Sequence, residues 1–431
     1  MAARPRIVVT GTGALCAAGK TPADIWAAVR AGRNAIGTIA QWDTTGWPAR
    51  KAGEIAGLEP FKLVTDRKLH KLIRRSDVFG LYAADRAIEA AGFAAYRAGL
   101  GEAAAAAFND GTGVYVGSGG GTYASQYDYF PLLAGSGGGL QGFGRQLGDT
   151  VNPMWLLRTL PNNVLCHIGI RHTLKGPNAC ITQHSVSGTL AIIEAFEALR
   201  CGEADRAVAV GHDAPIEPQM VLYYHHLGLL GGDVLRPYDA ARDGSLFGEG
   251  AAALVLETEA AAAARGAMVH GEILGSGCAS DALGLLPIRE DGDGLARAIA
   301  AALDDAGLRA ADVGMIVGHA NGTRQSDASE AAAIRALFGA APPPVTGFKW
   351  AFGHLIAASG AIESVLALLA LRERVVPGIA TLEVLDPALG DLPVSAAARA
   401  PRSDVALVLS RGFGGTNAAL LVRAAVATAG R

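Results

Sequence analysis

Short apolar runs bounded by glycine alternate along this chain with alanine-rich stretches of helical character. The run RIVVTGTG is followed by PADIWAAVRAG, and GVYVGSGGG is followed further on by AVAVGHDA. This alternation predicts an α/β protein with buried, largely parallel strands. The chain has 431 residues, 50% of them hydrophobic, which is enough to bury one large core or two fused ones.

Two segments of the chain resemble each other, which suggests a duplicated unit. One is HSVSGTLAIIEAFEAL, from His184, and the other is IAASGAIESVLALLAL, from Ile356. In each, small residues lead into an apolar helix. We expect a boundary near residue 260, because EGAAALVLETEAAAAARGA ends an apolar strand in a linker rich in alanine and glycine. The predicted halves are residues 1–260 and 261–431.

Charge, hydropathy and cysteine usage exclude several classes of protein. A formal net charge of -3 gives no overall electrostatic case for binding nucleic acid or an anionic membrane. We expect no membrane span, because the apolar stretch 361–376 is interrupted by charged residues. The five cysteines are widely spaced and form no C-x-x-C pair, so neither a disulfide framework nor a zinc site is indicated. We therefore expect a cytoplasmic protein with no metal and no cofactor.

The first candidate for chemistry is Ser185. It lies at the turn of GPNACITQHSVSGTLAIIEAFEALRCGEADRAVAVG, a pattern that predicts a strand, a sharp turn, a long helix and a second strand. The unpaired N–H groups at a helix N-terminus stabilise negative charge on an attacking oxygen or a bound carbonyl oxygen. Serine is also a preferred helix cap, so this pattern alone leaves both roles open.

Two further segments carry candidate residues. The stretch TGFKWAFGHLIAASGAIESV places Lys349 and His354 on the approach to the second apolar helix. A histidine there could be a general base or a structural residue. The stretch LSRGFGGTNAALLV sets three glycines around Phe413, which indicates tight turns or close approach of the backbone to a ligand. Backbone N–H groups in such a turn can form an oxyanion hole.

Three of these segments together resemble a known family. They stand in the order and spacing of the nucleophile elbow, the lysine–histidine loop and the closing strand of β-ketoacyl-acyl-carrier-protein synthases: GPNACITQHSVSG, FKWAFGHLIAASGA and GFGGTNAALL. Further similarity lies in RPYDAARDGSLFGEGAAALVLE, RRSDVFGLYAADRAIEAAG and the opening RIVVTGTGALCAAG, so it covers nearly the whole chain. The resemblance implies a duplicated thiolase-type fold with five layers, α-β-α-β-α, and usually a dimer.

The resemblance also implies departures at the active site. The family's nucleophilic cysteine falls on Ser185, whereas Cys180 belongs to the preceding strand. The family's H-G-T sequence matches Asn321 and the two residues after it, which makes the loop to Glu330 about two residues shorter than usual. The second family histidine is kept as His354, with Lys349 at the family spacing. Arg411 stands where the family commonly has phenylalanine.

In condensing members of that family, the cysteine accepts an acyl chain from a carrier protein, and two histidines help decarboxylate the malonyl donor. A serine needs a positioned base, for which His354 is the candidate, and its oxyester is a poorer electrophile toward a carbanion. Asn321 can donate a hydrogen bond to a carbonyl oxygen but cannot shuttle a proton. The first hypothesis is an acyltransferase impaired in condensation, with Ser185, His354, Lys349 and Asn321 as catalytic residues. The N–H groups of Ser185 and Phe413 would form the oxyanion hole, and the Phe413 side chain the acyl gate.

The rival hypothesis is a non-catalytic subunit like the family's chain-length factors, which shape the acyl tunnel of an active partner in a heterodimer. Ordinary chain elongation is a third. The expected partners are acyl carrier protein or acyl-coenzyme A, and a second synthase subunit, identical or different. For an acidic carrier protein, Arg67, Lys68 and Lys71 are the candidate docking residues, within one predicted helix in KLVTDRKLHKLIRR. A solvated helix face is the alternative for this stretch.

Overall fold

The computed structural model describes residues 4–120 and 129–425. Its main feature is a sheet with the strand order β10-β9-β11-β12-β8-β1-β7-β6-β4-β5. These strands are β1 (Ile7–Cys16), β4 (Thr112–Ser118), β5 (Asn178–Ile181), β6 (Arg206–Asp213), β7 (Gly250–Thr258), β8 (Gly271–Ser280), β9 (Met315–Val317), β10 (Val345–Thr346), β11 (Val405–Gly412) and β12 (Thr416–Ala424). A separate ribbon pairs β2 (Gly37–Thr38) with β3 (Lys51–Ala52).

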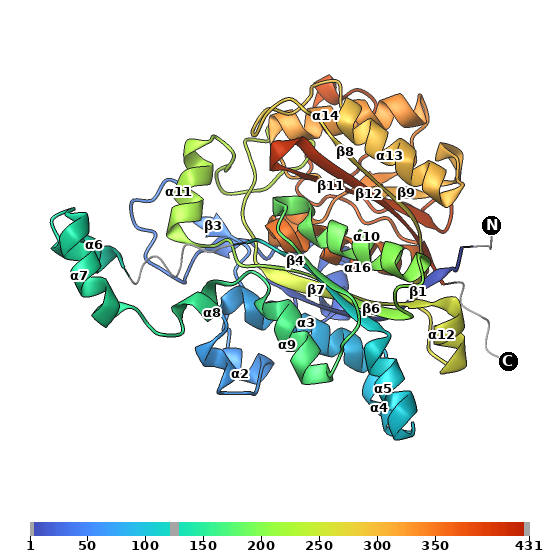
Figure 1. The fold of residues 1–431 in the computed structure, drawn as a ribbon. Coiled ribbons are helices and arrows are strands. Elements are labelled where there is room, and N and C mark those ends of the chain that lie inside the picture. The colour runs from blue at the N-terminus through green and yellow to red at the C-terminus, as the bar shows by residue number, and fades with distance from the viewer. Residues whose placement is uncertain (1–3, 121–128, 426–431) are drawn as a thin grey trace.

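The helices occupy the intervals between these strands (Figure 1). They are α1 (Pro22–Arg30), α2 (Pro60–Leu63), α3 (Arg75–Ala90), α4 (Phe93–Ala98), α5 (Glu102–Asp110), α6 (Phe130–Gly135), α7 (Leu140–Thr150), α8 (Trp155–Thr159), α9 (Asn163–His172), α10 (Ser187–Arg200), α11 (Pro218–His226), α12 (Glu259–Ala264), α13 (Asp293–Ala306), α14 (Arg324–Phe338), α15 (Lys349–Phe352) and α16 (Ser359–Arg372). Short 3₁₀ turns precede two of them: η3 (His184–Val186) leads into α10, and η5 (Ile356–Ala358) leads into α16.

The sheet consists of one five-stranded unit used twice. The order β1-β7-β6-β4-β5 in the first half is repeated as β8-β12-β11-β9-β10 in the second. In both halves the first two pairings are antiparallel and the last two are parallel. A short antiparallel pairing of β1 with β8 joins the halves. The first half ends at β7 and the second begins at β8, so the expected boundary near residue 260 falls within α12.

The expectation of largely parallel strands is wrong, because both halves are mixed. In the second half, a short connection explains one of the antiparallel pairings. The glycine-rich turn η7 (Phe413–Gly415) connects β11 directly to β12, so the chain reverses, and the two strands pair antiparallel along their length. A connection this short cannot join parallel strands, which need a crossover.

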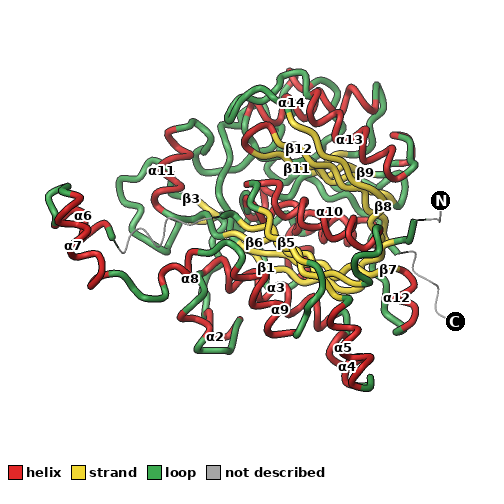
Figure 2. Tube along the Cα trace, viewed as in Figure 1, coloured by secondary structure: helices red, strands yellow, loops and turns green. Residues whose placement is uncertain are grey.

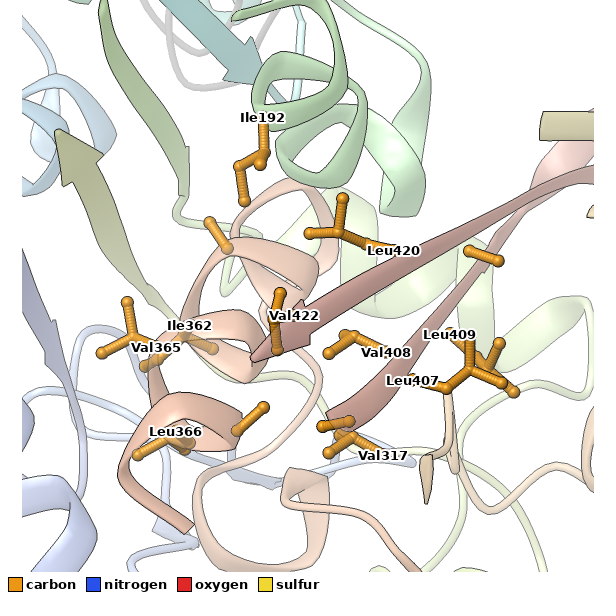
Figure 3. Packing of buried hydrophobic residues seen from close by; sticks show 14 of the residues in the cluster. Ile192, Val317, Ile362, Val365, Leu366, Leu407, Val408, Leu409, Leu420 and Val422 are labelled. Atoms are coloured by element: carbon orange, nitrogen blue, oxygen red, sulfur yellow. The ribbon is translucent and has the colours of Figure 1, made fainter. Parts of the chain in front are cut away.

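Helices form three layers around the two halves of the sheet. Figures 1 and 2 show α10 and α16 between the halves, α3 and α9 against the outer face of the first half, and α13 and α14 against the outer face of the second. Most residues of α16 are buried, as expected for a helix enclosed on all sides. Ile192, Ile362 and Val422 pack where α10, α16 and β12 meet (Figure 3). The predicted five-layered, duplicated thiolase-type fold is confirmed.

The two central helices approach each other closely through glycine. A Cβ atom at Gly188 in α10 would lie 2.5 Å from the carbonyl oxygen of Ala357 in η5, and one at Gly360 in α16 would lie 1.8 Å from the Oγ1 of Thr189. Side chains at these positions would push the helices apart. Close packing here fixes the N-termini of α10 and α16 next to each other.

The basic stretch 62–75, expected to form one helix, instead contains the end of α2, a separate 3₁₀ turn and the first residue of α3. After α2, the Oδ1 atom of Asp66 accepts hydrogen bonds from the N–H groups of Lys68 and Leu69, which starts the separate 3₁₀ turn η1 (Leu69–Lys71). Helix α3 then begins at Arg75. In the described ranges, no helix has both the length and the hydropathy to cross a membrane.

Candidate active site

Ser185 lies at the centre of the molecule, in η3 at the entrance to α10. Its relative exposure is 2%. The residue before it, His184, has a φ of 53°, and Ile356 at the equivalent place in η5 has a φ of 45°. Both turns therefore begin with a residue in the left-handed backbone conformation, which L-amino acids adopt only at a cost in free energy. The strained turn after β5 directs the Ser185 side chain toward the second half of the protein.

The Oγ atom of Ser185 contacts two imidazoles. It lies 3.1 Å from the Nε2 atom of His354 and 2.8 Å from the Nδ1 atom of His184. The Nδ1 atom of His354 is 2.9 Å from the Oγ of Ser359, and the Nε2 atom of His184 is hydrogen-bonded to the hydroxyl of Tyr224. The structure thus brings Ser185 and His354 together, as the sequence predicts, and adds a second histidine.

The side chain of Phe413, in the turn η7, packs against the ring of His184. The two rings stack with centroids 4.4 Å apart and an interplanar angle of 22°. At the adjacent Gly412, a Cβ atom would lie 3.5 Å from the backbone nitrogen of Ser185. The glycine-rich turn therefore lies against the backbone of Ser185. The oxyanion hole and the acyl gate remain predictions for Ser185 and Phe413.

Lys349 is fully buried, and its ammonium is bound by groups other than Ser185. Its Nζ atom donates to the Oε1 of Glu363 at 2.5 Å and to the backbone carbonyl of His319 at 2.6 Å. Burial raises the pKa of Glu363 to about 7. In this structure Lys349 fixes the backbone of the His319 loop and forms no hydrogen bond with the Ser185 hydroxyl. A direct catalytic role, as expected from the sequence, has no contact to support it.

His319 is a site residue that the sequence reasoning missed. Its ring lies 5.1 Å from that of His354, centroid to centroid, in an edge-to-face arrangement. Asn321, which the resemblance matches to the family's first histidine, lines the same cavity. Its Oδ1 atom accepts hydrogen bonds from the backbone N–H and the hydroxyl of Thr323, at 3.0 and 2.9 Å. Counted from Asn321, the loop to Glu330 is two residues short. Counted from His319, eleven residues before Glu330, it has the usual length.

The three histidines are neutral at pH 7. Burial lowers the pKa of His184 to about 4. Burial, reinforced by the charge of Lys349, lowers the pKa values of His319 and His354 well below their usual range. Neutral imidazoles next to a hydroxyl can accept its proton. Cys180 offers no competing nucleophile, because burial raises the pKa of its thiol to about 11.

A cavity of about 380 Å³ opens onto these groups. Its lining includes the apolar segment 285–288 together with Ser185, His319, His354, Asn321 and Phe413. The volume is within the usual range for sites that bind small molecules or a part of a larger ligand. A hydroxyl, neutral imidazoles and an apolar wall are groups that an acyl-transfer site requires.

Arg411 forms part of the same cavity wall. Its guanidinium is buried, donates from Nε to the Oδ1 of Asn417 at 2.9 Å and lies 3.5 Å from the carboxylate of Asp281. Its backbone N–H donates to the Nδ1 of His319 at 3.4 Å. A polar network therefore occupies the position where the resemblance leads one to expect a phenylalanine, and it ties β11 to the His319 loop.

Comparison with known proteins assigns the chain to a family. The model of the β-ketoacyl synthase N-terminal domain matches residues 4–262, and that of the C-terminal domain matches residues 270–383. The chain belongs to the β-ketoacyl synthase family. Two curated relatives of this β-ketoacyl synthase are nodulation protein E of Rhizobium meliloti, 32% identical over 96% of this chain and 98% of the relative, and 3-oxoacyl-[acyl-carrier-protein] synthase 2 of Synechocystis sp., 33% identical over 97% of each.

Solved structures agree with this assignment over the whole fold. The ishigamide ketosynthase/chain length factor has a TM-score of 0.85 and 28% identity, covering 98% of this chain and 100% of that one. A β-ketoacyl synthase from Burkholderia phymatum has the same TM-score, identity and coverage. This β-ketoacyl synthase thus shares its fold both with a protein named as a β-ketoacyl synthase and with one named as a ketosynthase/chain length factor.

Proposed function

We propose that this β-ketoacyl synthase is a ketosynthase-like acyltransferase of fatty-acid or polyketide biosynthesis. Ser185 accepts an acyl group from a thioester of acyl carrier protein or coenzyme A, and a neutral imidazole in contact with its hydroxyl, for which the sequence suggests His354, serves as the base. The observation that carries this proposal is the Ser185 hydroxyl itself, which lies buried at the cavity within hydrogen-bond distance of two neutral imidazoles.

Decarboxylative condensation is the impaired step. The ester formed on Ser185 is less electrophilic toward a carbanion than a thioester, so transfer to water, an alcohol or an amine suffers less. We also propose that His319, rather than Asn321, takes the place of the family's first histidine. Its position beside His354 and its distance along the chain from Glu330 support this. Asn321 remains available to donate a hydrogen bond within the cavity.

The alternative is a non-catalytic subunit that shapes the acyl tunnel of an active partner. The structural likeness to a chain of the ishigamide ketosynthase/chain length factor, whose name includes both kinds of subunit, is consistent with it. Against it stands the set of buried, mutually contacting groups at Ser185, which a purely structural subunit does not need. Under either proposal the protein assembles with a second synthase subunit, identical in a homodimer or different in a heterodimer.

Release of free thiol separates the two proposals. The protein, alone and with a cysteine-bearing partner synthase, is mixed with short, long and aromatic acyl-coenzyme A and acyl-carrier-protein donors. A thiol reagent then follows the products. An acyltransferase releases a burst of about one thiol per active site, because acylation precedes turnover. A silent subunit releases none on its own and adds none to the burst of its partner.

A second prediction concerns carrier-protein docking. Arg67, Lys68 and Lys71 are exposed and form no ion pair with the residues that the structure describes. The double variant Lys68→Glu/Lys71→Glu should weaken carrier-protein binding on the order of tenfold, because two exposed pairings are lost and like charges replace them. The effect should shrink as salt is raised, since exposed charges are screened over about 10 Å at 0.1 M.

The matched control for docking is Lys20→Glu/Arg33→Glu, which changes the net charge equally at two other exposed residues. Titration calorimetry with acyl carrier protein compares the two variants. Equal affinities for both would place the docking face elsewhere on the protein.

A further inference from the structure

The hydroxyl of Ser185 has one proton, yet two imidazole nitrogens lie within hydrogen-bond distance of its oxygen. It can donate to only one of them, so the other must donate to it. The two imidazoles must therefore have different roles. The outer nitrogens continue the chain, from His184 to the hydroxyl of Tyr224 and from His354 to the hydroxyl of Ser359. The hydrogen bonds in this chain can run in either of two directions.

Three features favour proton transfer toward His184. The contact from Ser185 is shorter to His184, at 2.8 Å, than to His354, at 3.1 Å. The ring of His184 stacks on Phe413, and an aromatic face stabilises a cationic partner. The Tyr224 hydroxyl can accept the N–H at Nε2 and so orient the ring, as the third member of a catalytic triad does.

The surroundings of His354 oppose a positive charge. The neighbouring groups are the ammonium of Lys349, held on the His319 carbonyl, and the rings of His319 and His184. Burial and the charge of Lys349 lower the pKa of His354, whereas burial alone lowers the pKa of His184. The groups that face His184 are Ser185, Tyr224 and Phe413, together with His319 and His354, and none of them is a cation.

We propose that His184 is the general base for Ser185, that Tyr224 orients it, and that His354 donates a hydrogen bond from Nε2 to the reacting oxygen atoms. This assignment rests on the proposed function and refines the role that the sequence suggests for His354. It identifies His184 as a catalytic residue and Tyr224 as a positioning residue.

Acylation of Ser185 proceeds through attack on the thioester and collapse of a tetrahedral species. The Oγ atom of Ser185 forms a bond to the thioester carbonyl carbon while its proton moves to the Nδ1 atom of His184, and the carbonyl π electrons move onto oxygen. When the tetrahedral species collapses, the carbon–sulfur bond breaks and its electron pair leaves with sulfur. The proton on His184 then passes to that sulfur. The products are the Ser185 ester and the free thiol of the carrier.

The test compares two single variants of the full chain. His184→Gly removes the imidazole at a residue whose φ of 53° suits glycine, so the fold should be retained. The acylation rate should fall about a hundredfold or more, the usual contribution of a general base. Added imidazole should restore part of the rate. His354→Gln keeps an N–H donor but no proton acceptor, and it should remain within about tenfold of the wild type.

A third variant, Tyr224→Phe, keeps the ring and removes the partner of the His184 Nε2 atom. It should lower the acylation rate constant several-fold and leave the half-saturating donor concentration unchanged. A loss confined to donor binding would contradict the orienting role.

The outcomes separate this inference from the proposed function. A slow His184→Gly variant, rescued by imidazole, beside an active His354→Gln variant supports the assignment. Wild-type rates in His184→Gly, or equal losses in both variants, overturn it while leaving acylation of Ser185 intact. If the wild type is not acylated by any donor, both the proposed function and this inference are contradicted.

Discussion

Ser185→Ala is expected to abolish acylation by thioester donors. The rate should fall by a factor on the order of 10³ or more, because the substitution removes the hydroxyl that both His184 and His354 contact. The fold should persist, since the change removes a single buried oxygen at the cavity wall. The thiol burst, measured at equal protein concentration, provides the comparison.

The matched control is Ser136→Ala, at a half-buried serine that follows α6 and does not line the cavity. This variant should give the wild-type burst. A burst that survives in Ser185→Ala would mean that another nucleophile accepts the acyl group, and the role assigned to the strained η3 turn would be wrong.

Ser185→Cys is expected to gain decarboxylative condensation. A thiolate at a helix N-terminus beside an imidazole has a lowered pKa, and the thioester that it forms is the better electrophile toward a carbanion. The other requirements stand close by, since His319 and His354 both line the cavity. The yield of β-ketoacyl product from acyl- and malonyl-carrier protein should rise about tenfold or more over the wild type.

The control for this gain is the double variant Ser185→Cys/His319→Ala. It should still accept the acyl group but should lose the condensation product, because the first histidine of the pair is absent. If Ser185→Cys is acylated yet forms no product, the cavity around Asn321 and Arg411 does not admit the malonyl donor, and the impairment lies in shape rather than in the nucleophile.

The duplicated fold could be predicted because its signals are local. The apolar helix that follows Ser185 and the one that follows Ile356 repeat the same pattern, and the structure gives each a 3₁₀ turn and a helix of the same length. Strand direction could not be predicted in this way, because it depends on which strands become neighbours. The glycines after Phe413 indicate a turn, but the antiparallel partner of β11 is decided by long-range pairing.

Part of the candidate site could be predicted from the sequence for a related reason. Ser185 and His354 stand in segments whose spacing is informative by itself. The sequence reasoning did not consider His319, which we propose takes the place of the family's first histidine, because the resemblance matched N-G-T at Asn321. The length of the loop to Glu330 was the signal available for it. His184 lies next to Ser185 in the sequence, but its role depends on Tyr224 and Phe413, which only the folded chain brings to it.

The central claim is that Ser185 becomes acylated, and intact-protein mass spectrometry after incubation with acyl thioesters tests it most directly. The donors are short, long and aromatic acyl groups on coenzyme A and on acyl carrier protein, with the protein alone and with a partner synthase. We expect a single added acyl group, located on the peptide that contains Ser185 and absent from Ser185→Ala. An unmodified wild-type protein under all of these conditions would contradict it and leave the non-catalytic subunit as the better description.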